Sequence, residues 1–173
     1  MDFSELALSR RSIRSFLDKP ISNDLIKKLL EAAQAAPSGG NCQPWHFFVI
    51  KDKSFVSKIC EKAIKQDFIK SAPVVIVVCA DISKTIDRYG ARGKNLYCIQ
   101  DTAAAIQNIL LCAASLNLGT CWCGAFDEET LSEVMQLNAD FRPVAIIPVG
   151  YFTTTPAMPR RRSLSEIATF IGE

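Results

Sequence analysis

The hydrophobic residues fall into blocks whose length and spacing alternate between strand and helix patterns. Residues 74–80 form a continuous apolar run of strand length, which predicts a central strand covered on both faces. Residues 46–50 and 143–150 predict two further buried strands. Pro148 lies inside the last of these and indicates an edge position or a bulge, because proline has no N–H for the ladder. Since strands and helices alternate, the class is mixed α and β.

Helical spacing recurs between these strands. Ser22 caps a predicted helix that ends near Ala36 and carries its apolar residues at positions 25, 26, 29, 30 and 33. The other expected elements are helices at 3–8, 54–63 (capped by Ser54), 97–116 and 128–137 (capped by Asp127), a loop or short helix at 81–94, a short strand leading into a loop at 120–126, a linker at 153–159, and a helix or strand at 164–171.

The expected helix at 97–116 is apolar on all sides, with Asp101 as its only charge. Such a helix is either the centre of a large core or partly covered by a second chain. Gln100, Gln107 and Asn108 argue against a membrane span. A chain of this size has difficulty covering the helix alone, so we expect a homodimer with this helix at or near the interface.

Length and charge narrow the class further. The chain has 173 residues, which predicts a single domain over residues 1–173, and its net charge of +2 is too small to indicate a nucleic-acid partner. The arginines are concentrated near the two ends, at 10, 11 and 14 and at 160–162, whereas residues 95–141 contain no lysine or arginine. Either both chain ends converge on one anion, or the molecule has two separate basic tails.

Seven cysteines and one histidine bear on metal and redox chemistry. The cysteines lie mostly in apolar runs without a CxxC pair, and the amino terminus does not resemble a signal peptide, so we expect reduced, buried thiols in a cytoplasmic protein. Cys121 and Cys123 flank a tryptophan, but His46 alone does not complete a tetrahedral metal site. We expect no metal and a structural role for His46.

Residues 9–16 contain the candidate anion site. If they are extended, Arg10, Ser12 and Arg14 share one side, because successive side chains of a strand alternate. Guanidinium forks and a hydroxyl suit phosphate oxygens. Arg10 and Arg14 would lie roughly 13 Å apart, so a long ligand with its phosphate near Arg10 and Ser12 fits better than a lone phosphate. The alternative is a solvated basic edge.

A second candidate is the loop Pro37-Ser38-Gly39-Gly40-Asn41-Cys42-Gln43-Pro44-Trp45. Its turn-forming residues and two side-chain amides place donors within reach of a ligand. It is equally compatible with a plain connection between elements.

Four separated blocks resemble the FMN-dependent nitroreductase family. They are Arg10-Arg11-Ser12-Ile13-Arg14, residues 36–47, Leu118-Gly119-Thr120-Cys121-Trp122-Cys123-Gly124-Ala125-Phe126, and the terminal arginine cluster. The resemblance extends over nearly the whole chain in the same order. It implies an α+β, nitroreductase-like fold with a central, mostly antiparallel sheet flanked by helices, and an intertwined homodimer that holds two FMN molecules at its interface.

The resemblance also implies roles for individual residues. The FMN phosphate is expected near Arg10, Arg11 and Ser12, and the N1/O2 side of the flavin near Arg14. The full cofactor-binding set that it implies is Arg10, Arg11, Ser12, Arg14, Pro37, Ser38, Asn41, Gln43, Cys123, Gly124, Ala125, Arg160 and Arg162. Within this set, Ser38, Asn41 and Gln43 serve the FMN of the other subunit, the backbone of residues 123–125 lies against the flavin edge, and Arg160 and Arg162 are taken from the three terminal arginines as phosphate partners.

The activity implied is that of a flavoprotein oxidoreductase. NADH or NADPH passes hydride to the flavin, the oxidised nucleotide leaves, and a small acceptor such as a nitroaromatic or a quinone replaces it in a ping-pong cycle. No acid or base residue is needed, because the flavin performs the chemistry and Arg14 stabilises its negative charge.

Three alternatives stay open: a flavin dehalogenase or dehydrogenase on the same scaffold, a non-catalytic FMN carrier dimer, and a nucleotide-binding protein without flavin. Residues 81–94 are the expected lid, because long irregular segments of compact domains are often functional. The family's mid-chain polar contacts to FMN have no match near residues 66–70.

Overall fold

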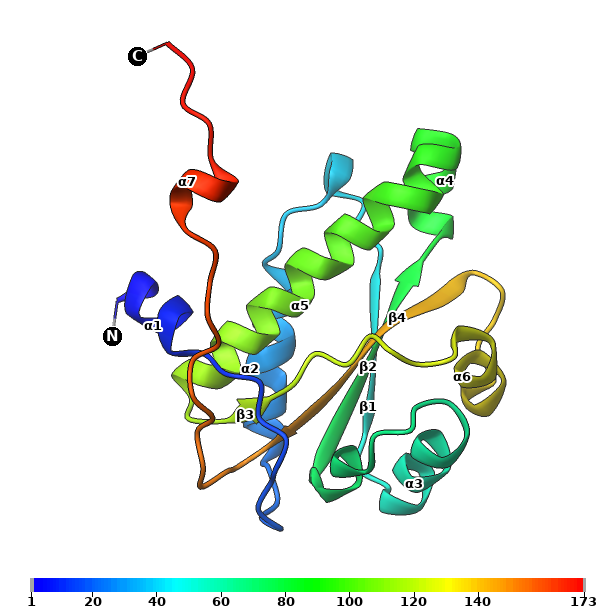
Figure 1. Ribbon diagram of the computed structural model, residues 1–173. Helices are drawn as coiled ribbons and strands as arrows, with labels where there is room; N and C mark the ends of the chain where they lie inside the picture. Colours follow the sequence, from blue (N-terminus) through cyan, green and yellow to red (C-terminus); the bar gives the residue numbers. More distant parts are fainter. Residues whose placement is uncertain (1, 173) are drawn as a thin grey trace.

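The computed structural model describes residues 2–172 and contains a four-stranded antiparallel sheet in the order β1-β2-β4-β3 (Figure 1). The strands are β1 (Trp45–Ile50), β2 (Val74–Asp81), β3 (Gly119–Thr120) and β4 (Phe141–Gly150). β2 pairs along its length with both β1 and β4, and its first seven residues are buried. The predicted central strand and the α+β class are confirmed.

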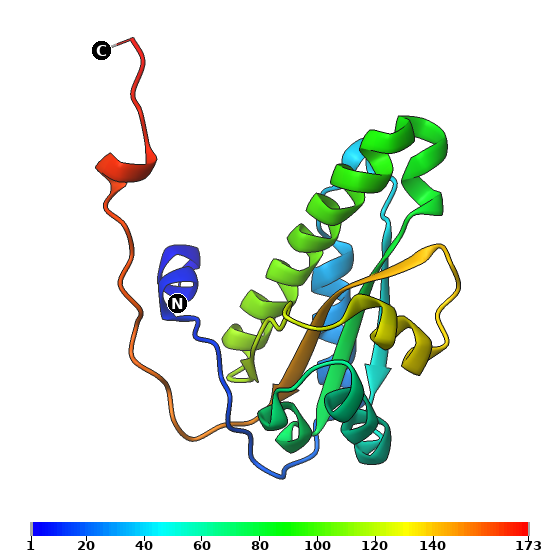
Figure 2. The same cartoon turned by 45° about the vertical axis from the view of Figure 1, so that its right-hand side comes forward.

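Helices cover both faces of the sheet (Figure 2). One face packs against α2 (Asn23–Gln34) and α5 (Cys98–Ser115), using Ile76 and Val78, and the other packs against α3 (Lys53–Lys62) and α6 (Glu128–Met135), using Val75 and Val77. Since side chains alternate along a strand, an uninterrupted apolar run is required where both faces are covered.

Three helices have caps that were predicted from the sequence, and two of the three predictions are confirmed. Ser22 and Asp127 cap α2 and α6 as predicted, accepting hydrogen bonds from the backbone N–H groups of residues 25 and 130. The predicted cap at Ser54 is wrong. Asp52 caps α3 instead, because its carboxylate accepts from the N–H groups of Ser54 at 2.8 Å and Phe55 at 3.2 Å, and a charged acceptor binds these donors more strongly than a hydroxyl.

The expectations for two strands need correction. β1 is an edge strand in which only Ile50 is buried, and Val49 is 37% exposed, so it is not the buried strand predicted. β4 is internal, although it contains Pro148. Ile146 donates its N–H to Cys123 on the β3 side. The backbone nitrogen of Pro148, two residues further along, faces the same side. It carries no N–H, and the ladder loses no bond there because β3 pairs only with residues 149 and 150.

Residues 81–94 are helical rather than a long irregular segment. α4 (Ser83–Arg92) continues through a π-helical turn (Gly93–Tyr97) directly into α5. The chain changes direction at Gly90, which has φ 55° and ψ −141°, a backbone conformation that essentially only glycine adopts. The argument for a lid that rested on irregularity is therefore lost.

The two chain ends lie side by side outside the core. α1 (Phe3–Ser9) contains no buried residue, and the tail after β4 passes it, forms only the short α7 (Leu164–Ile167), and extends away from the body (Figures 1 and 2). The tail is exposed from residue 153 to residue 172, including Phe170 and Ile171. The remaining short elements are two 3₁₀ turns, Gly39–Asn41 and Asp67–Ser71.

Replacing Gly150 by alanine is expected to destabilise the protein by about 1–3 kcal/mol through overpacking. A Cβ there would lie 2.8 Å from both the Phe16 ring and the Pro73 ring, whereas at Gly124 the nearest atom would be Trp122 Nε1 at 3.9 Å. Urea unfolding of the apoprotein should therefore show a large loss for Gly150→Ala and almost none for Gly124→Ala. Equal losses would contradict the packing described.

Candidate functional site

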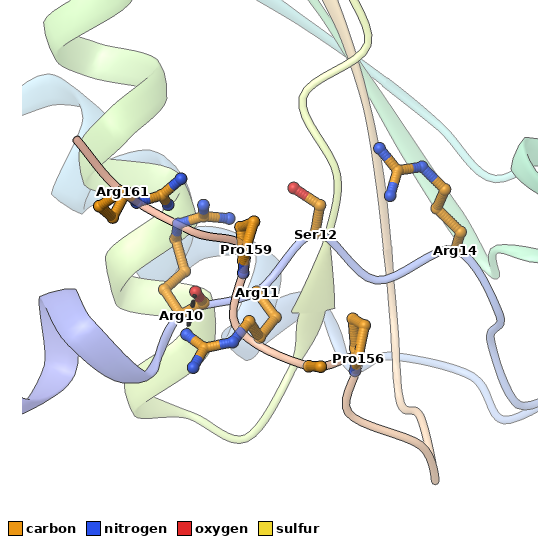
Figure 3. A pocket seen from close by; sticks show the side chains of 8 residues that line it. Arg10, Arg11, Ser12, Arg14, Pro156, Pro159 and Arg161 are labelled. Atoms are coloured by element: carbon orange, nitrogen blue, oxygen red, sulfur yellow. Dashed lines mark hydrogen bonds between the residues drawn. The ribbon is translucent and has the colours of Figure 1, made fainter.

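The segment from Arg10 to Arg14 is extended and anchored by its apolar residues. Ser12 forms a parallel bridge with Thr120, and Ile13 donates its N–H to the Thr120 carbonyl at 2.9 Å. Ile13 is buried, which turns the alternate residues outward. Figure 3 shows Arg10, Ser12 and Arg14 on one side of the segment and Arg11 on the other, as the alternation predicted.

The tail brings a further arginine to this side. Arg161 and Arg10 both line an open pocket of about 440 Å³, and their side chains lie close together (Figure 3). The pocket is lined by Arg10, Arg11, Ser12, Arg14, Pro156, Ala157, Pro159 and Arg161, and we call it the arginine pocket. Cationic residues from both ends of the chain therefore meet in one place, and the alternative of two separate basic tails is excluded.

The charge of the arginine pocket is uncompensated. Burial first, and then the positive charge of Arg161, lower the pKa of Arg10. Within residues 2–172, no carboxylate lies within 4.0 Å of the guanidinium nitrogens of Arg10, Arg14 or Arg161. Neighbouring guanidinium groups that repel one another and include a hydroxyl between them form a site for a multiply charged oxyanion.

The arginines of the two clusters differ in what they contact. Arg11 turns back to the end of α1 and donates to the carbonyls of Leu8 at 2.6 Å and Arg10 at 2.9 Å, while its buried Nε has no partner. Arg162 donates to the Glu166 carbonyl at 2.6 Å. Arg160 and Arg162 line a neighbouring pocket with Arg161. Of the three terminal arginines, the structure thus brings Arg161 into the arginine pocket, and sequence reasoning had chosen the other two.

The segment of residues 121–125 follows β3, and its first residue, Cys121, lies close to Ser12 and Arg14. Cys123 is buried and bridges Ile146 of β4, whereas Gly124 and Ala125 are exposed. The pKa of the Cys121 thiol is lowered, first by a hydrogen bond with Cys123 and then, against the effect of burial, by the charge of Arg14. Arg14 itself lies over the Phe68 ring, 5.9 Å from its centroid.

The loop at residues 37–43 is held by a buried carboxylate. Asp101, in the first turn of α5, accepts the N–H of Gly39 with both oxygens, at 3.1 and 3.2 Å. Ser38 Oγ accepts the N–H of Gln43 at 3.0 Å. Asn41 and Gln43 have positive φ, and their amides are exposed. The loop therefore presents polar groups on a fixed backbone, as a binding loop requires.

This loop and the arginine pocket lie at opposite ends of α5. Asp101 holds the loop at the start of the helix, while Ala114, near its end, lies beside Arg10 and Arg11. At 1.5 Å per residue these ends are about 20 Å apart. Within one chain, the loop residues Ser38, Asn41 and Gln43 therefore lie too far from the arginines to bind the same ligand. A site shared between two chains would require this separation.

Sequence reasoning did not identify the contacts of four residues at the two candidate sites. At the loop, Asp101 is the anchor, and the Arg88 guanidinium donates to the Gly40 carbonyl at 2.7 Å. At the arginine pocket, Arg161 joins the lining and Phe68 lies beneath Arg14. The lone charge in an otherwise apolar helix was the available signal for Asp101. The other three contacts join residues 48 or more positions apart and have no local pattern.

We expect the effect of Asp101→Asn on stability to depend on pH. Burial raises the pKa of Asp101, although the Gly39 N–H opposes the shift. The folded protein therefore loses stability as pH rises from the ordinary aspartate pKa, about 3.9, through the raised value. Asparagine does not ionise, so the variant does not lose this stability. The free energy of unfolding of Asp101→Asn minus that of the unaltered protein should therefore increase over that range of pH.

Urea titrations at a series of pH values measure this difference, with Asp127→Asn as the control. Hydrogen bonds from Thr130 lower the pKa of Asp127. The free energy of unfolding of Asp127→Asn minus that of the unaltered protein should therefore decrease as pH rises towards the ordinary aspartate pKa. A pH-independent difference for Asp101→Asn would contradict the assignment.

Comparisons with known proteins agree over most of the chain. The model of the nitroreductase family matches residues 7–65 and 55–151. A protein of Methanothermobacter thermautotrophicus, provisionally named NADH dehydrogenase/NAD(P)H nitroreductase, is 36% identical over 90% of this chain and 80% of its own. FMN reductase [NAD(P)H] of Bacillus subtilis is 29% identical over 82% of this chain and 62% of its own. A nitroreductase family protein of Clostridium difficile has a crystal structure with TM-score 0.86 and 32% identity, covering 98% of both chains.

Two features are absent from residues 2–172. These residues contain no helix with the length and apolarity needed to cross a membrane. They also bring no three His, Cys, Asp or Glu side chains together in a metal-binding arrangement.

Proposed function

Because the chain belongs to the nitroreductase family, we propose that it is an FMN-dependent oxidoreductase. It takes hydride from NADH or NADPH and, in a separate half-reaction at the same open site, passes electrons to a small acceptor of nitroaromatic or quinone type. The names of two relatives, an NAD(P)H nitroreductase and an FMN reductase, support this class of reaction.

The arginine pocket is the observation that carries the proposal. Its donors, Arg10, Ser12 and Arg161, have the chemistry that a phosphate monoester needs, and Arg10 has no carboxylate partner within residues 2–172. The side chain of Arg14 points to the same side of the segment (Figure 3), where a positive charge suits the N1/O2 end of the ring. The residues present therefore fit FMN.

Bound FMN supplies reversible acceptance of a hydride, and the chain's residues supply binding and charge. Arg10, Ser12 and Arg161 hold the phosphate. Arg14 would keep a positive charge at the ring end. In the segment of residues 123–125, Gly124 or Ala125 would offer its N–H to the ring edge, because the Cys123 N–H already donates to the Ile146 carbonyl. Such fixed donors need no reorganisation as negative charge develops.

The site contains no histidine that acts as an acid or base. His46 lies in β1, stacked on Phe141 with ring centroids 4.6 Å apart and tilted against Phe48 at the same distance. Its contacts match the structural role expected from the sequence. In the proposed cycle, solvent that enters the open pocket serves as the source of protons.

We further propose that two copies form each site. The outer face of α5 leaves Ala103, Leu111 and Ala114 partly exposed, and the tail exposes Leu164 and Phe170. The accessible surface is 10080 Å², compared with about 8,400 Å² expected for a compact monomer of this mass. The excess, roughly 1,700 Å², matches surface that a dimer would cover. The loop with Ser38, Asn41 and Gln43 would then serve the partner's arginine pocket.

Anaerobic titration of the purified protein tests the proposed function. The protein should be yellow, NADH or NADPH should bleach it, and a nitroaromatic or quinone should restore the colour. If the protein contains FMN that neither nucleotide reduces, it is a non-catalytic FMN carrier. If only halogenated phenols reoxidise the reduced flavin, it is a dehalogenase. A colourless protein that binds no added FMN would overturn the proposal.

A further inference from the structure

A basic and aromatic surface lies at the end of α4. It consists of Arg88, Tyr89, Arg92 and Tyr97, and we call it the α4 patch. The Arg88 and Arg92 guanidinium carbons lie 5.4 and 5.3 Å from the ring centroids of Tyr89 and Tyr97, and the two rings meet edge to face at 5.0 Å. Arg92 Nε also donates to the Tyr97 hydroxyl at 3.0 Å. The four side chains form one continuous surface.

The backbone that shapes the α4 patch is specialised. The turn at Gly90 needs a conformation reserved for glycine, and a Cβ at Gly93 would collide with the carbonyl of Thr85. A π-helical turn follows at Gly93–Tyr97. Helical turns of this kind are frequent at functional sites. Here the turn brings Tyr97 against Tyr89, eight residues earlier.

The arginines of the α4 patch are exposed and lack an acidic partner. Within residues 2–172, no carboxylate lies within 4.0 Å of the nitrogens of Arg88 or Arg92. By contrast, Arg142 binds both oxygens of Glu128, at 2.8 and 3.2 Å. The two α4 guanidinium groups therefore keep donors for an external anion.

The α4 patch adjoins the loop that we assign to the partner's flavin. Arg88 donates to the Gly40 carbonyl at 2.7 Å, and a Cβ at Gly39 would lie 3.7 Å from the Tyr97 ring and 3.8 Å from the Tyr89 ring. Figure 1 shows this loop and α4 at the same end of α5. A molecule approaching the flavin beside this loop would meet the α4 patch.

We propose that the α4 patch binds the anionic group, a phosphate or carboxylate, of the substrates that react at the flavin. The inference rests on the proposed function and names the substrate class. A guanidinium fork binds phosphate or carboxylate through two parallel hydrogen bonds, and tyrosine faces accept a planar ring beside it. The anion belongs either to the nucleotide donor or to the acceptor.

The test compares Arg88→Gln/Arg92→Gln with two matched variants. Arg88→Lys/Arg92→Lys keeps both charges, and Lys58→Gln/Lys62→Gln removes two charges from α3, where both lysines are exposed. Bound FMN and the melting temperature are recorded for each, because loss of the Arg88 bond to Gly40 could disturb the loop.

Each half-reaction is measured with charged and neutral substrates. The donors are NADPH, NADH and N-benzyl-1,4-dihydronicotinamide, which has no phosphate, and the acceptors are 4-nitrobenzoate and the neutral 4-nitrobenzyl alcohol. The readout is the ratio of kcat/KM for the charged substrate to that for the neutral one. A purely structural role would lower both values and leave the ratio unchanged.

In the glutamine variant we expect this ratio to fall about tenfold or more in one half-reaction, as loss of a charge-assisted bond predicts. The half-reaction affected identifies the anion as the donor's or the acceptor's. The lysine variant should retain most of the ratio, and the α3 variant all of it. Ratios within about twofold of the unaltered protein in both half-reactions would overturn the inference, while good turnover of the neutral substrates would leave the proposed function intact.

Discussion

The variant Arg10→Ala/Arg161→Ala is expected to lose FMN on dialysis, with affinity reduced by at least about a hundredfold. A hydrogen bond to a charged group contributes about 1.5–3 kcal/mol, which is about 10- to 100-fold in affinity for each arginine. Both guanidinium groups line the arginine pocket from opposite ends of the chain. Fluorescence titration of FMN into the apoprotein measures the dissociation constant directly.

The apoprotein of this variant should be at least as stable as the unaltered one. Arg161 lowers the pKa of Arg10, so the two cations repel each other when no anion lies between them. The single variants Arg160→Ala and Arg162→Ala serve as controls, because these residues line the neighbouring pocket. A larger loss of FMN affinity from either control than from Arg161→Ala would favour Arg160 or Arg162 as the phosphate partner, as the sequence suggested. It would contradict the assignment of Arg161.

Arg14→Ala is expected to lower the reduction potential of bound flavin and to slow its reduction by NADH or NADPH. Removing a positive charge near the ring disfavours the added negative charge. A drop of about 30 to 60 mV would correspond to about 1.4 to 2.8 kcal/mol for two electrons. Equilibration with a dye of known potential measures the shift.

Arg14→Lys is the matched variant for this prediction. It keeps the charge but not the guanidinium that lies over Phe68, so the potential should stay near that of the unaltered protein. Arg14 is exposed, and neither change should affect folding. An unchanged potential in Arg14→Ala would rule out the electrostatic role.

Local patterns in the sequence were sufficient for most of the fold. The apolar run at residues 74–80 identified the central strand, and Ser22 and Asp127 identified two helix starts. β1 was misjudged because an apolar run reads the same on an edge strand, where aromatic residues cover one another. Residues 81–94 stayed open between a loop and a short helix because Gly90 and Gly93 usually interrupt helices, whereas here they permit a sharp turn and a close approach to Thr85.

The site was predictable where alternation decides it and not where distant segments meet. The shared side of Arg10, Ser12 and Arg14 followed from an extended backbone (Figure 3). The choice of Arg161 over its neighbours depends on the path of an exposed tail, which three consecutive arginines do not specify. The role of Asp101 depends on the loop after α2 meeting the start of α5. Its lone charge in an apolar helix was a local signal, but its partner Gly39 is reached only through this tertiary contact.

Complementation between two defective subunits tests the shared site most directly. One subunit carries Arg10→Ala/Ser12→Ala, the other carries Asn41→Ala/Gln43→Ala, and the co-expressed heterodimer is purified with two different tags. If each site combines the arginines of one chain with the loop of the other, one of the two sites in the heterodimer is intact. We therefore predict about half the FMN content of the unaltered dimer, and almost none in either parent. A heterodimer as empty as its parents would contradict the account.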